Sequence, residues 1–290
     1  MTVRIATRRS PLALWQTHHV RQLLQMAQPG LSVEVVDLET SADQQLDLRI
    51  ADIGGKGAFC KEVQALVLDG VADVAVHSAK DLQAETPAGL RLAAVPNRGD
   101  ARDALIGCRL ADLRPGALVA TGSQRRRVQL AEIRPDLQFA ELRGNIATRL
   151  GRLGEFDAIV MAAVALERLE IELPVVEILE PEVMLPQVGQ GALAVECRSG
   201  DASVLEILAL LDHHDSRTLV DAERDFLKEL GGDCDLPAGA HARFVGEDVM
   251  VVGVLAADVD RPDTVRRASL TAPAVDRPGR MLARRLAARL

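Results

Sequence analysis

The chain has 290 residues, 48% of them hydrophobic, which is enough apolar material for a folded core and for two or three domains of ordinary size. Its formal net charge is −8 and only 2% of its residues are aromatic, so it lacks the basic surface and stacking side chains of a general nucleic-acid-binding protein. No apolar run approaches the length of a membrane span, and the first residues lack a secretory-signal pattern. We therefore expect a cytoplasmic protein with no membrane partner and no nucleic-acid partner.

The first part of the chain predicts an α/β fold. Short apolar segments near Val3, Val33 and Val74 are typical of strands and alternate with longer segments of helical period, the pattern of a parallel sheet with crossover helices. Ser10 is placed to cap a helix that begins at Pro11.

A second helix is expected where Phe59, Val63 and Val67 share one face, with its end at Gly70. Proline and glycine then interrupt the pattern between Val95 and Asp100, where we expect a domain boundary. Three further strands are predicted in the segments ALVATGS, LQFAELRGN and DAIVMAA.

After about residue 212 the pattern changes again. A helix over about 219–230, two strand-like segments and a helix near 280–290 predict a small α+β domain. The expected domains are 1–96 with 190–212, then 97–189, then 213–290.

Three consecutive arginines, Arg125, Arg126 and Arg127, fall in the first turn of a predicted helix. Cations at that end oppose the helix macrodipole and are disfavoured by roughly 0.3–1 kcal/mol each. Two explanations are open. The arginines and the free helix amides bind an anionic ligand, or the arginines form salt bridges with acidic neighbours.

Three more arginines lie close to predicted strand ends. Arg143 follows one strand, Arg149 lies on the next helix, and Arg168 comes shortly after the following strand. Ligands of open α/β sheets bind beyond the carboxyl ends of the strands, and guanidinium groups recognise carboxylates and phosphates. This set therefore favours a polyanionic ligand.

The segment DVAVHSAKDL places Ser78, Lys80 and Asp81 at the end of a buried strand. An aspartate in a cationic pocket stays ionised and can stabilise a positive charge on a substrate or transfer a proton. Asp81 is therefore the candidate catalytic carboxylate. The competing explanation is that Lys80 and Asp81 only cap the next element.

The glycine-rich segment GGKGAFCKE does not fit a phosphate-binding loop, because glycine follows Lys56 where serine or threonine is required. It fits a mobile loop of about Ser41–Gly57 that covers a site, with Lys56 as a further anion contact. The segment VGQGALAVECR also lacks the third glycine of a dinucleotide fingerprint.

The cysteines form no close metal-binding pair, and the two pairs of adjacent histidines point in different directions on a helix, so we expect free thiols and no metal site. Cys234 lies in a glycine-broken loop and is the cysteine expected to be most accessible. Asp233 and Asp235 beside it raise the pKa of a thiol, which argues against ordinary cysteine catalysis. A permanently attached group needs no activated thiol.

Seven segments resemble, in order, the signature segments of the porphobilinogen deaminase family. They are RIATRRSPLALWQ, GGKGAFCKE, VHSAKDL, TGSQRRRVQLA, LRGNIATRL, LPQVGQGALAVECR and GGDCDLPAG. The chain departs from the family pattern at Asp233, where glycine is usual, and at Gln83, where proline is usual.

The resemblance implies two periplasmic-binding-protein-like α/β domains and a smaller α+β C-terminal domain, in a monomeric enzyme. It implies a dipyrromethane cofactor held by a thioether to Cys234, with Asp81 as the catalytic aspartate. Such transferases deaminate and condense four porphobilinogen molecules head to tail and release the linear tetrapyrrole hydroxymethylbilane, in heme biosynthesis.

The resemblance also implies two sets of binding residues. The cofactor-binding set is Cys234, Lys80, Ser78, Thr121, Ser123, Arg125, Arg126, Arg143, Asn145 and Gln190. The substrate-binding set is Arg8, Ser10, Arg149, Arg168, Lys56 and Phe59. The alternative is a non-enzymatic anion-binding protein with two α/β lobes, like a periplasmic solute receptor, which explains the arginines but not GGDCDLP.

Overall fold

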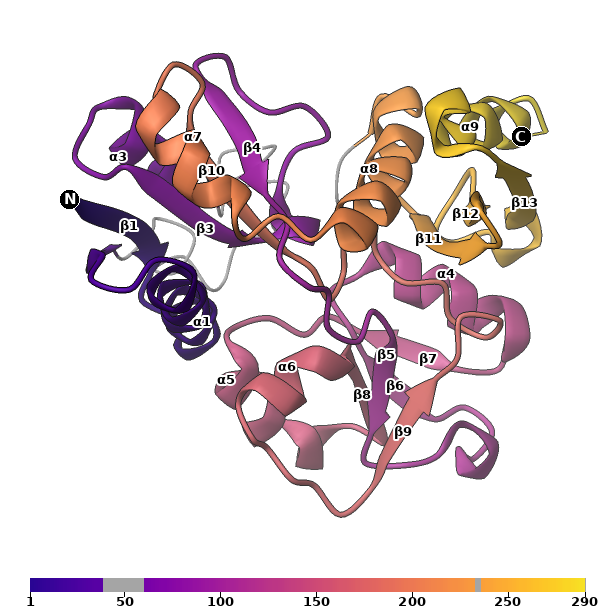
Figure 1. The fold of residues 1–290 in the computed structure, drawn as a ribbon. Helices are drawn as coiled ribbons and strands as arrows, with labels where there is room; N and C mark the ends of the chain where they lie inside the picture. Colours follow the sequence, from indigo (N-terminus) through magenta and orange to yellow (C-terminus); the bar gives the residue numbers. More distant parts are fainter. Residues whose placement is uncertain (39–59, 233–235, 290) are drawn as a thin grey trace. The chain divides into compact units, whose positions relative to one another are not determined.

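The computed structural model describes residues 1–38, 60–232 and 236–289. The chain divides into two compact units, Met1–Gly99 with Gly191–Thr218, and Asp100–Gln190 with Leu219–Leu290 (Figure 1). The described residues form three β-sheets, and each of the three predicted domains contains one of them. This mixture of α/β sheets and a smaller C-terminal α+β part confirms the predicted fold class.

The first unit contains a five-stranded sheet of order β2-β1-β3-β10-β4. Its elements are β1 (Thr2–Arg8), α1 (Pro11–Ala27), β2 (Ser32–Leu38), α3 (Lys61–Leu68), β3 (Val74–Ser78), the 3-10 turn η1 (Ala79–Asp81), β4 (Leu90–Ala94), β10 (Leu193–Arg198) and α7 (Ala202–Ala209). Strand β1 pairs in parallel with β2 and β3, whereas β10 runs antiparallel to β3 and β4.

The predicted parallel pairing is found for β2, β1 and β3, whereas β10 runs antiparallel to its neighbours. Parallel neighbours arise from crossover connections, but β10 joins the sheet only after the chain has built the second α/β sheet, so that rule does not set its direction.

Apolar side chains cover both faces of this sheet. Val3 and Ile5 of β1 pack in one cluster with Val20 and Leu24 of α1. Ala6, on the opposite face of β1, packs in a second cluster with residues of α3. Burial on both faces explains why the strands are read in the sequence as continuous apolar runs.

The second unit contains a five-stranded sheet of order β7-β6-β8-β5-β9. Its elements are β5 (Asp103–Ile106), η2 (Leu110–Asp112), β6 (Leu118–Ala120), α4 (Gln124–Ile133), β7 (Gln138–Ala140), α5 (Ile146–Gly151), η3 (Leu153–Glu155), β8 (Ala158–Ala162), α6 (Ala163–Arg168) and β9 (Val176–Leu179). Strand β5 runs antiparallel to β8 and β9. Both α/β sheets thus place an antiparallel strand fourth in the order.

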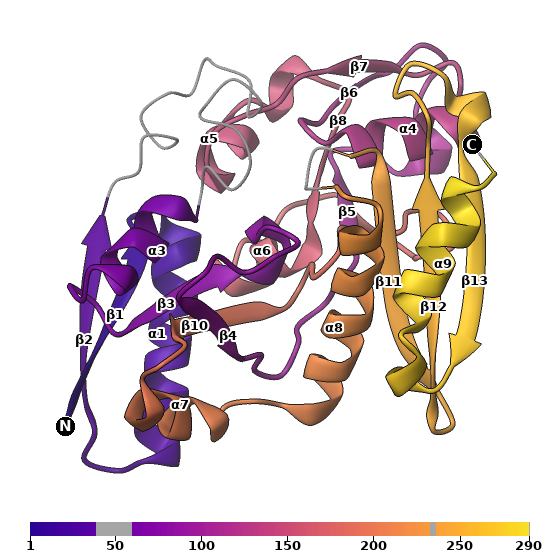
Figure 2. The same cartoon turned by 90° about the horizontal axis from the view of Figure 1, so that it is seen from above.

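The C-terminal part contains an antiparallel sheet of order β11-β12-β13. Its elements are α8 (His214–Glu229), β11 (Ala238–Val245), β12 (Asp248–Leu255), η4 (Pro262–Thr264), β13 (Arg266–Ala272), η5 (Ala274–Asp276) and α9 (Pro278–Ala287). In Figure 2, α8 and α9 lie side by side along this sheet. They approach so closely that a Cβ atom on Gly279 would lie 1.8 Å from the Ala222 carbonyl oxygen.

The structure corrects the predicted boundaries in this part. Helix α8 begins at His214 rather than near residue 219, α9 begins at Pro278, and β13 was not predicted. Among the helices that the structure describes, none is both long enough and apolar enough to span a bilayer.

Candidate active site

The first unit carries a small cavity at the carboxyl ends of two parallel strands. Strand β1 leads to α1 and then to β2 on one side, while β3 lies on its other side, so the strand order reverses between β1 and β3. Ligand sites of open α/β sheets form at such a point. Here Arg8, Ser10, Ser78 and Asp81, together with six neighbouring residues, line a cavity of about 60 Å³.

Helix α1 begins at this cavity. The Ser10 hydroxyl accepts a hydrogen bond from the Ala13 amide at 3.3 Å, and Pro11 is the first helical residue, as predicted. The Gln16 side-chain amide donates to the Ser78 hydroxyl at 2.8 Å, which joins α1 to the end of β3. A helix N-terminus and the Arg8 guanidinium together favour a bound carboxylate.

Asp81 is the last residue of η1 and is half-buried. Its backbone carbonyl accepts a hydrogen bond from the Cys60 thiol at 3.2 Å, and Asp81 is one of the residues that line the cavity. Lys80, on the same turn, is also half-buried but is not one of the residues that line the cavity.

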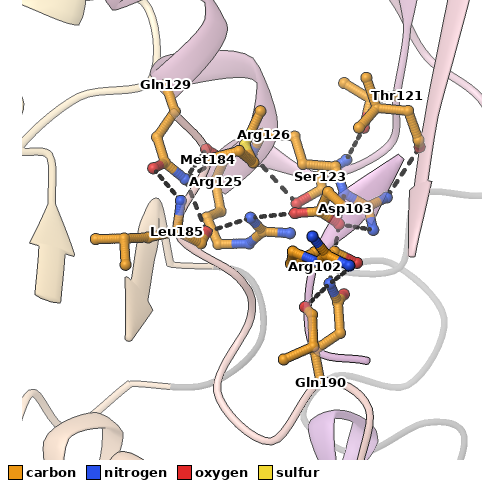
Figure 3. A network of polar contacts seen from close by, with 12 residues as sticks. Arg102, Asp103, Thr121, Ser123, Arg125, Arg126, Gln129, Met184, Leu185 and Gln190 are labelled. Atoms are coloured by element: carbon orange, nitrogen blue, oxygen red, sulfur yellow. Dashed lines mark hydrogen bonds and ion pairs between the residues drawn. The ribbon is translucent and has the colours of Figure 1, made fainter. Parts of the chain in front are cut away.

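The second unit holds an ion-pair cluster around Asp103 (Figure 3). Arg125 donates from Nη1 to Asp103 Oδ2 at 2.8 Å. Arg126 donates to Asp103 Oδ1 from Nε at 3.0 Å and from Nη2 at 2.8 Å. The Gln190 amide donates to the same oxygen at 3.0 Å. Four hydrogen bonds therefore converge on one carboxylate.

The charged side chains of this cluster are almost completely buried. The side chains of Arg125 and Asp103 are 1% and 0% exposed, and that of Arg126 is 8% exposed. Burial raises the pKa of Asp103, but Arg125 and Arg126 more than offset this and lower it to about 2. Asp103 therefore stays ionised and offsets the unfavourable position of the two arginines at the start of α4.

Asp103 was not among the site residues predicted from the sequence. It begins β5 and pairs with Ala162, the last residue of β8, so the antiparallel direction of β5 brings its first residue to the carboxyl end of β8. The sequence signal was an aspartate directly before the apolar segment ALI, just after the predicted domain boundary.

The other predicted residues of the second unit lie on three segments. Thr121 is buried and Ser123 caps α4 by accepting from the Arg126 amide at 3.5 Å. Asn145 caps α5 and accepts from the Thr148 amide at 2.9 Å. Arg143 is half-buried and lies on the loop before α5, with its Nη2 3.6 Å from a carboxylate oxygen of Glu141.

Arg149 and Arg168 complete the predicted set in this unit. Arg149 lies on α5 and donates from Nε to the Gly144 carbonyl at 2.7 Å. Arg168 ends α6, and burial lowers its pKa to about 10. Lys56, Phe59 and Cys234, and the loop Ser41–Gly57, lie outside the described residues.

Within each unit, polar and charged side chains lie where parallel strands end. This is where α/β enzymes have their ligand sites, so the fold and the site define a protein of this class. Two family models match the chain: "Porphobilinogen deaminase, dipyromethane cofactor binding domain" over residues 3–206, and "Porphobilinogen deaminase, C-terminal domain" over residues 218–283. The chain belongs to the porphobilinogen deaminase family. Its members are hydroxymethylbilane synthases, which are transferases of porphyrin and heme biosynthesis, and porphobilinogen is the substrate that the family implies.

Solved structures match only distantly. The periplasmic domain of BvgS from Bordetella pertussis is 17% identical with a TM-score of 0.41, and the match covers 72% of this chain and 39% of that one. A nutrient-binding protein from Burkholderia cenocepacia, bound to methionine, is 15% identical with a TM-score of 0.43, over 71% of this chain and 89% of that one. The OxyR regulatory domain from Pseudomonas aeruginosa is 12% identical with a TM-score of 0.41, over 72% of this chain and 95% of that one. Similarity at this level carries no argument about function.

Proposed function

We propose that this enzyme deaminates four porphobilinogen molecules and condenses them head to tail on a dipyrromethane attached by a thioether to Cys234, and then releases hydroxymethylbilane. Family membership across residues 3–206 and 218–283 supports the reaction class. The observation that carries the assignment of residues is the shared cavity of Arg8, Ser10 and Asp81 in the first unit.

The donor set of the second unit fits a polycarboxylate such as the dipyrromethane cofactor, since each pyrrole unit built from porphobilinogen carries an acetate and a propionate. Arg143 lies on the loop before α5 and Arg149 on α5, and both are half-buried. Arg126, in the first turn of α4, and Arg168, at the end of α6, are mostly buried. The Nε atom of Arg125 is buried and has no hydrogen-bond partner in the described structure, so this cluster retains unused donor capacity. When bound, dipyrromethane would supply the free pyrrole carbon to which the first unit is joined, and each later unit would be joined to the terminal pyrrole of the growing chain.

In this proposal the residues of the first unit act on the incoming porphobilinogen. Arg8 and the N-terminus of α1 hold a substrate carboxylate, because both present positive electrostatic potential. The Asp81 carboxylate stabilises positive charge that develops on the pyrrole nitrogen and accepts or returns a proton there. With the Asp103 carboxylate included, the cluster of Arg125 and Arg126 has a net charge of +1 rather than +2. The same carboxylate holds both guanidinium groups in position.

The assignment is tested by an assay of porphobilinogen turnover in which the release of ammonia and the formation of tetrapyrrole are both measured. Asp81→Ala should lose at least about 100-fold in kcat, since a positioned acid–base group contributes roughly 10²–10⁴-fold. Asp69→Ala is the matched control, because Asp69 is an exposed aspartate of the same unit. Near-wild-type kcat in Asp81→Ala would remove Asp81 from the mechanism.

A wild-type protein that binds porphobilinogen without releasing ammonia would instead support the anion-binding receptor. The cytoplasmic location, the monomeric state and the three-domain division stay predictions.

A further inference from the structure

A buried ion pair lies directly behind the cavity of the first unit. His77 precedes Ser78 in β3, and Glu196 belongs to β10, where Ala194 is the residue opposite His77. Residues two apart on a strand share a face, so Glu196 is the diagonal neighbour of His77. Nε2 of His77 lies 3.3 Å from Oε2 of Glu196, and the side chains are 4% and 0% exposed.

Glu196 is also tied to the helix that follows residue 60. The Gln64 side-chain amide of α3 donates to Glu196 Oε2 at 2.7 Å, and Gln64 is 4% exposed. The His77–Glu196 pair therefore joins β3, β10 and α3. Buried ion pairs often add little net stability compared with neutral residues of similar shape, so stability alone does not account for this one.

The same side chains border the segment that carries Asp81. His77 and Cys60 line the cavity together with Asp81, and the Cys60 thiol donates to the Asp81 carbonyl. The Ala79 amide donates to the Ala192 carbonyl, just before β10, at 3.0 Å. The chain from His77 to Asp81 is thus held from α3 on one side and from β10 on another.

Charge strengthens this arrangement. Burial by itself lowers the pKa of His77, whereas the Glu196 carboxylate beside it raises this pKa. The Glu196 carboxylate, 3.3 Å from the ring, therefore favours the imidazolium form of His77. The other charged side chains around the same cavity are Arg8, from β1, and Asp81, from η1.

We propose that the His77–Glu196 pair is a positioning device for the reaction: it fixes the backbone of Ser78–Asp81 so that the Asp81 carboxylate stays directed into the cavity. This inference rests on the proposed role of Asp81. The pair acts through that residue, and His77 and Glu196 are positioning residues rather than groups that react.

The test uses the full-length enzyme with the double variant His77→Gln/Glu196→Gln, which leaves no unpaired charge in the interior, and with Glu206→Gln as an exposed control in the same unit. The double variant should lose tenfold or more in kcat, with KM within about twofold and the melting temperature close to that of the wild type. The control should match the wild type in all three. The proposal is overturned if the double variant keeps the wild-type kcat, or if a rise in KM accounts for the whole loss in kcat/KM.

A spectroscopic measurement on the wild-type protein provides a second test, which does not depend on the stability of the double variant. Nitrogen-15 NMR of the histidine side chains, assigned with His77→Gln, should show both ring nitrogens of His77 protonated at pH 8. A neutral His77 at that pH overturns the proposal. Asp81→Ala, measured in parallel, separates the two claims, because full activity there contradicts the proposed function itself.

Discussion

Asp103→Asn should strongly destabilise the second unit at neutral pH. The substitution keeps the shape of the side chain but removes the only charge that the structure shows hydrogen-bonded to both Arg125 and Arg126 in the described residues. Breaking a buried ion pair by removing one partner costs about 3–5 kcal/mol, because an uncompensated charge stays buried. Two guanidinium groups are affected here, and with the pH dependence of Asp103 as the lower end we expect a loss of about 2–5 kcal/mol.

The pH dependence gives a second estimate of the magnitude. The pKa of Asp103 is lowered from 3.8 to about 2. A carboxylate with a depressed pKa stabilises the fold above its unfolded pKa, and this stabilisation is lost as pH falls through the folded pKa. The difference corresponds to about 2 kcal/mol that is present at pH 7 and disappears between about pH 4 and pH 2.

Urea denaturation of the wild type, Asp103→Asn and Asp136→Asn measures both effects. Asp136 pairs with Arg134 at the surface, where its side chain is 37% exposed, so its loss should cost much less stability than the loss of Asp103. The gap between the wild type and Asp103→Asn should narrow as pH falls from 4 towards 2. A free energy of unfolding for Asp103→Asn within about 1 kcal/mol of the wild type at pH 7 would refute this account of the cluster.

Three further predictions concern the cap, a helix contact and an arginine. Ser10→Ala should cost about 1 kcal/mol in thermal unfolding, since it removes the hydroxyl that accepts from the Ala13 amide; an unchanged melting temperature would contradict the cap. Gly279→Ala should destabilise the protein by about 1–3 kcal/mol, because the new Cβ meets a carbonyl oxygen at 1.8 Å, and a stabilised variant would show that the helices separate freely. Arg149→Gln should reduce tetrapyrrole formation at least tenfold, whereas Arg127→Gln, at a half-exposed arginine paired with Asp260, should not; equal rates would contradict the proposed carboxylate contact.

The sequence predicted the elements that local chemistry determines. The Ser10-Pro11 cap, the apolar strand around Val74 and the helix start after Ser123 all depend on side chains close in sequence, and all three are found in the structure. The two antiparallel strands that complete the α/β sheets were not predicted as such, because their direction depends on connections between distant parts of the chain.

For the charged residues, too, the sequence indicated what depends on nearby residues but not which distant residues pair with them. The arginines at the start of α4 were recognised as anomalous from the sequence, and both explanations offered for them involved a negative charge. The structure supplies that charge from Asp103, which is 22 residues from Arg125 in the chain and reaches it only through strand pairing. The His77–Glu196 pair was not predicted for the same reason, since its partners lie on strands that only the fold brings together.

Mass spectrometry of the intact purified protein tests the central claim most directly, because it asks whether a pyrrole adduct is attached. We expect the wild type to carry a covalent adduct equal in mass to two pyrrole units, and Cys234→Ser to carry none and to lose turnover. A fully active wild-type protein with the mass of the bare polypeptide would contradict the account.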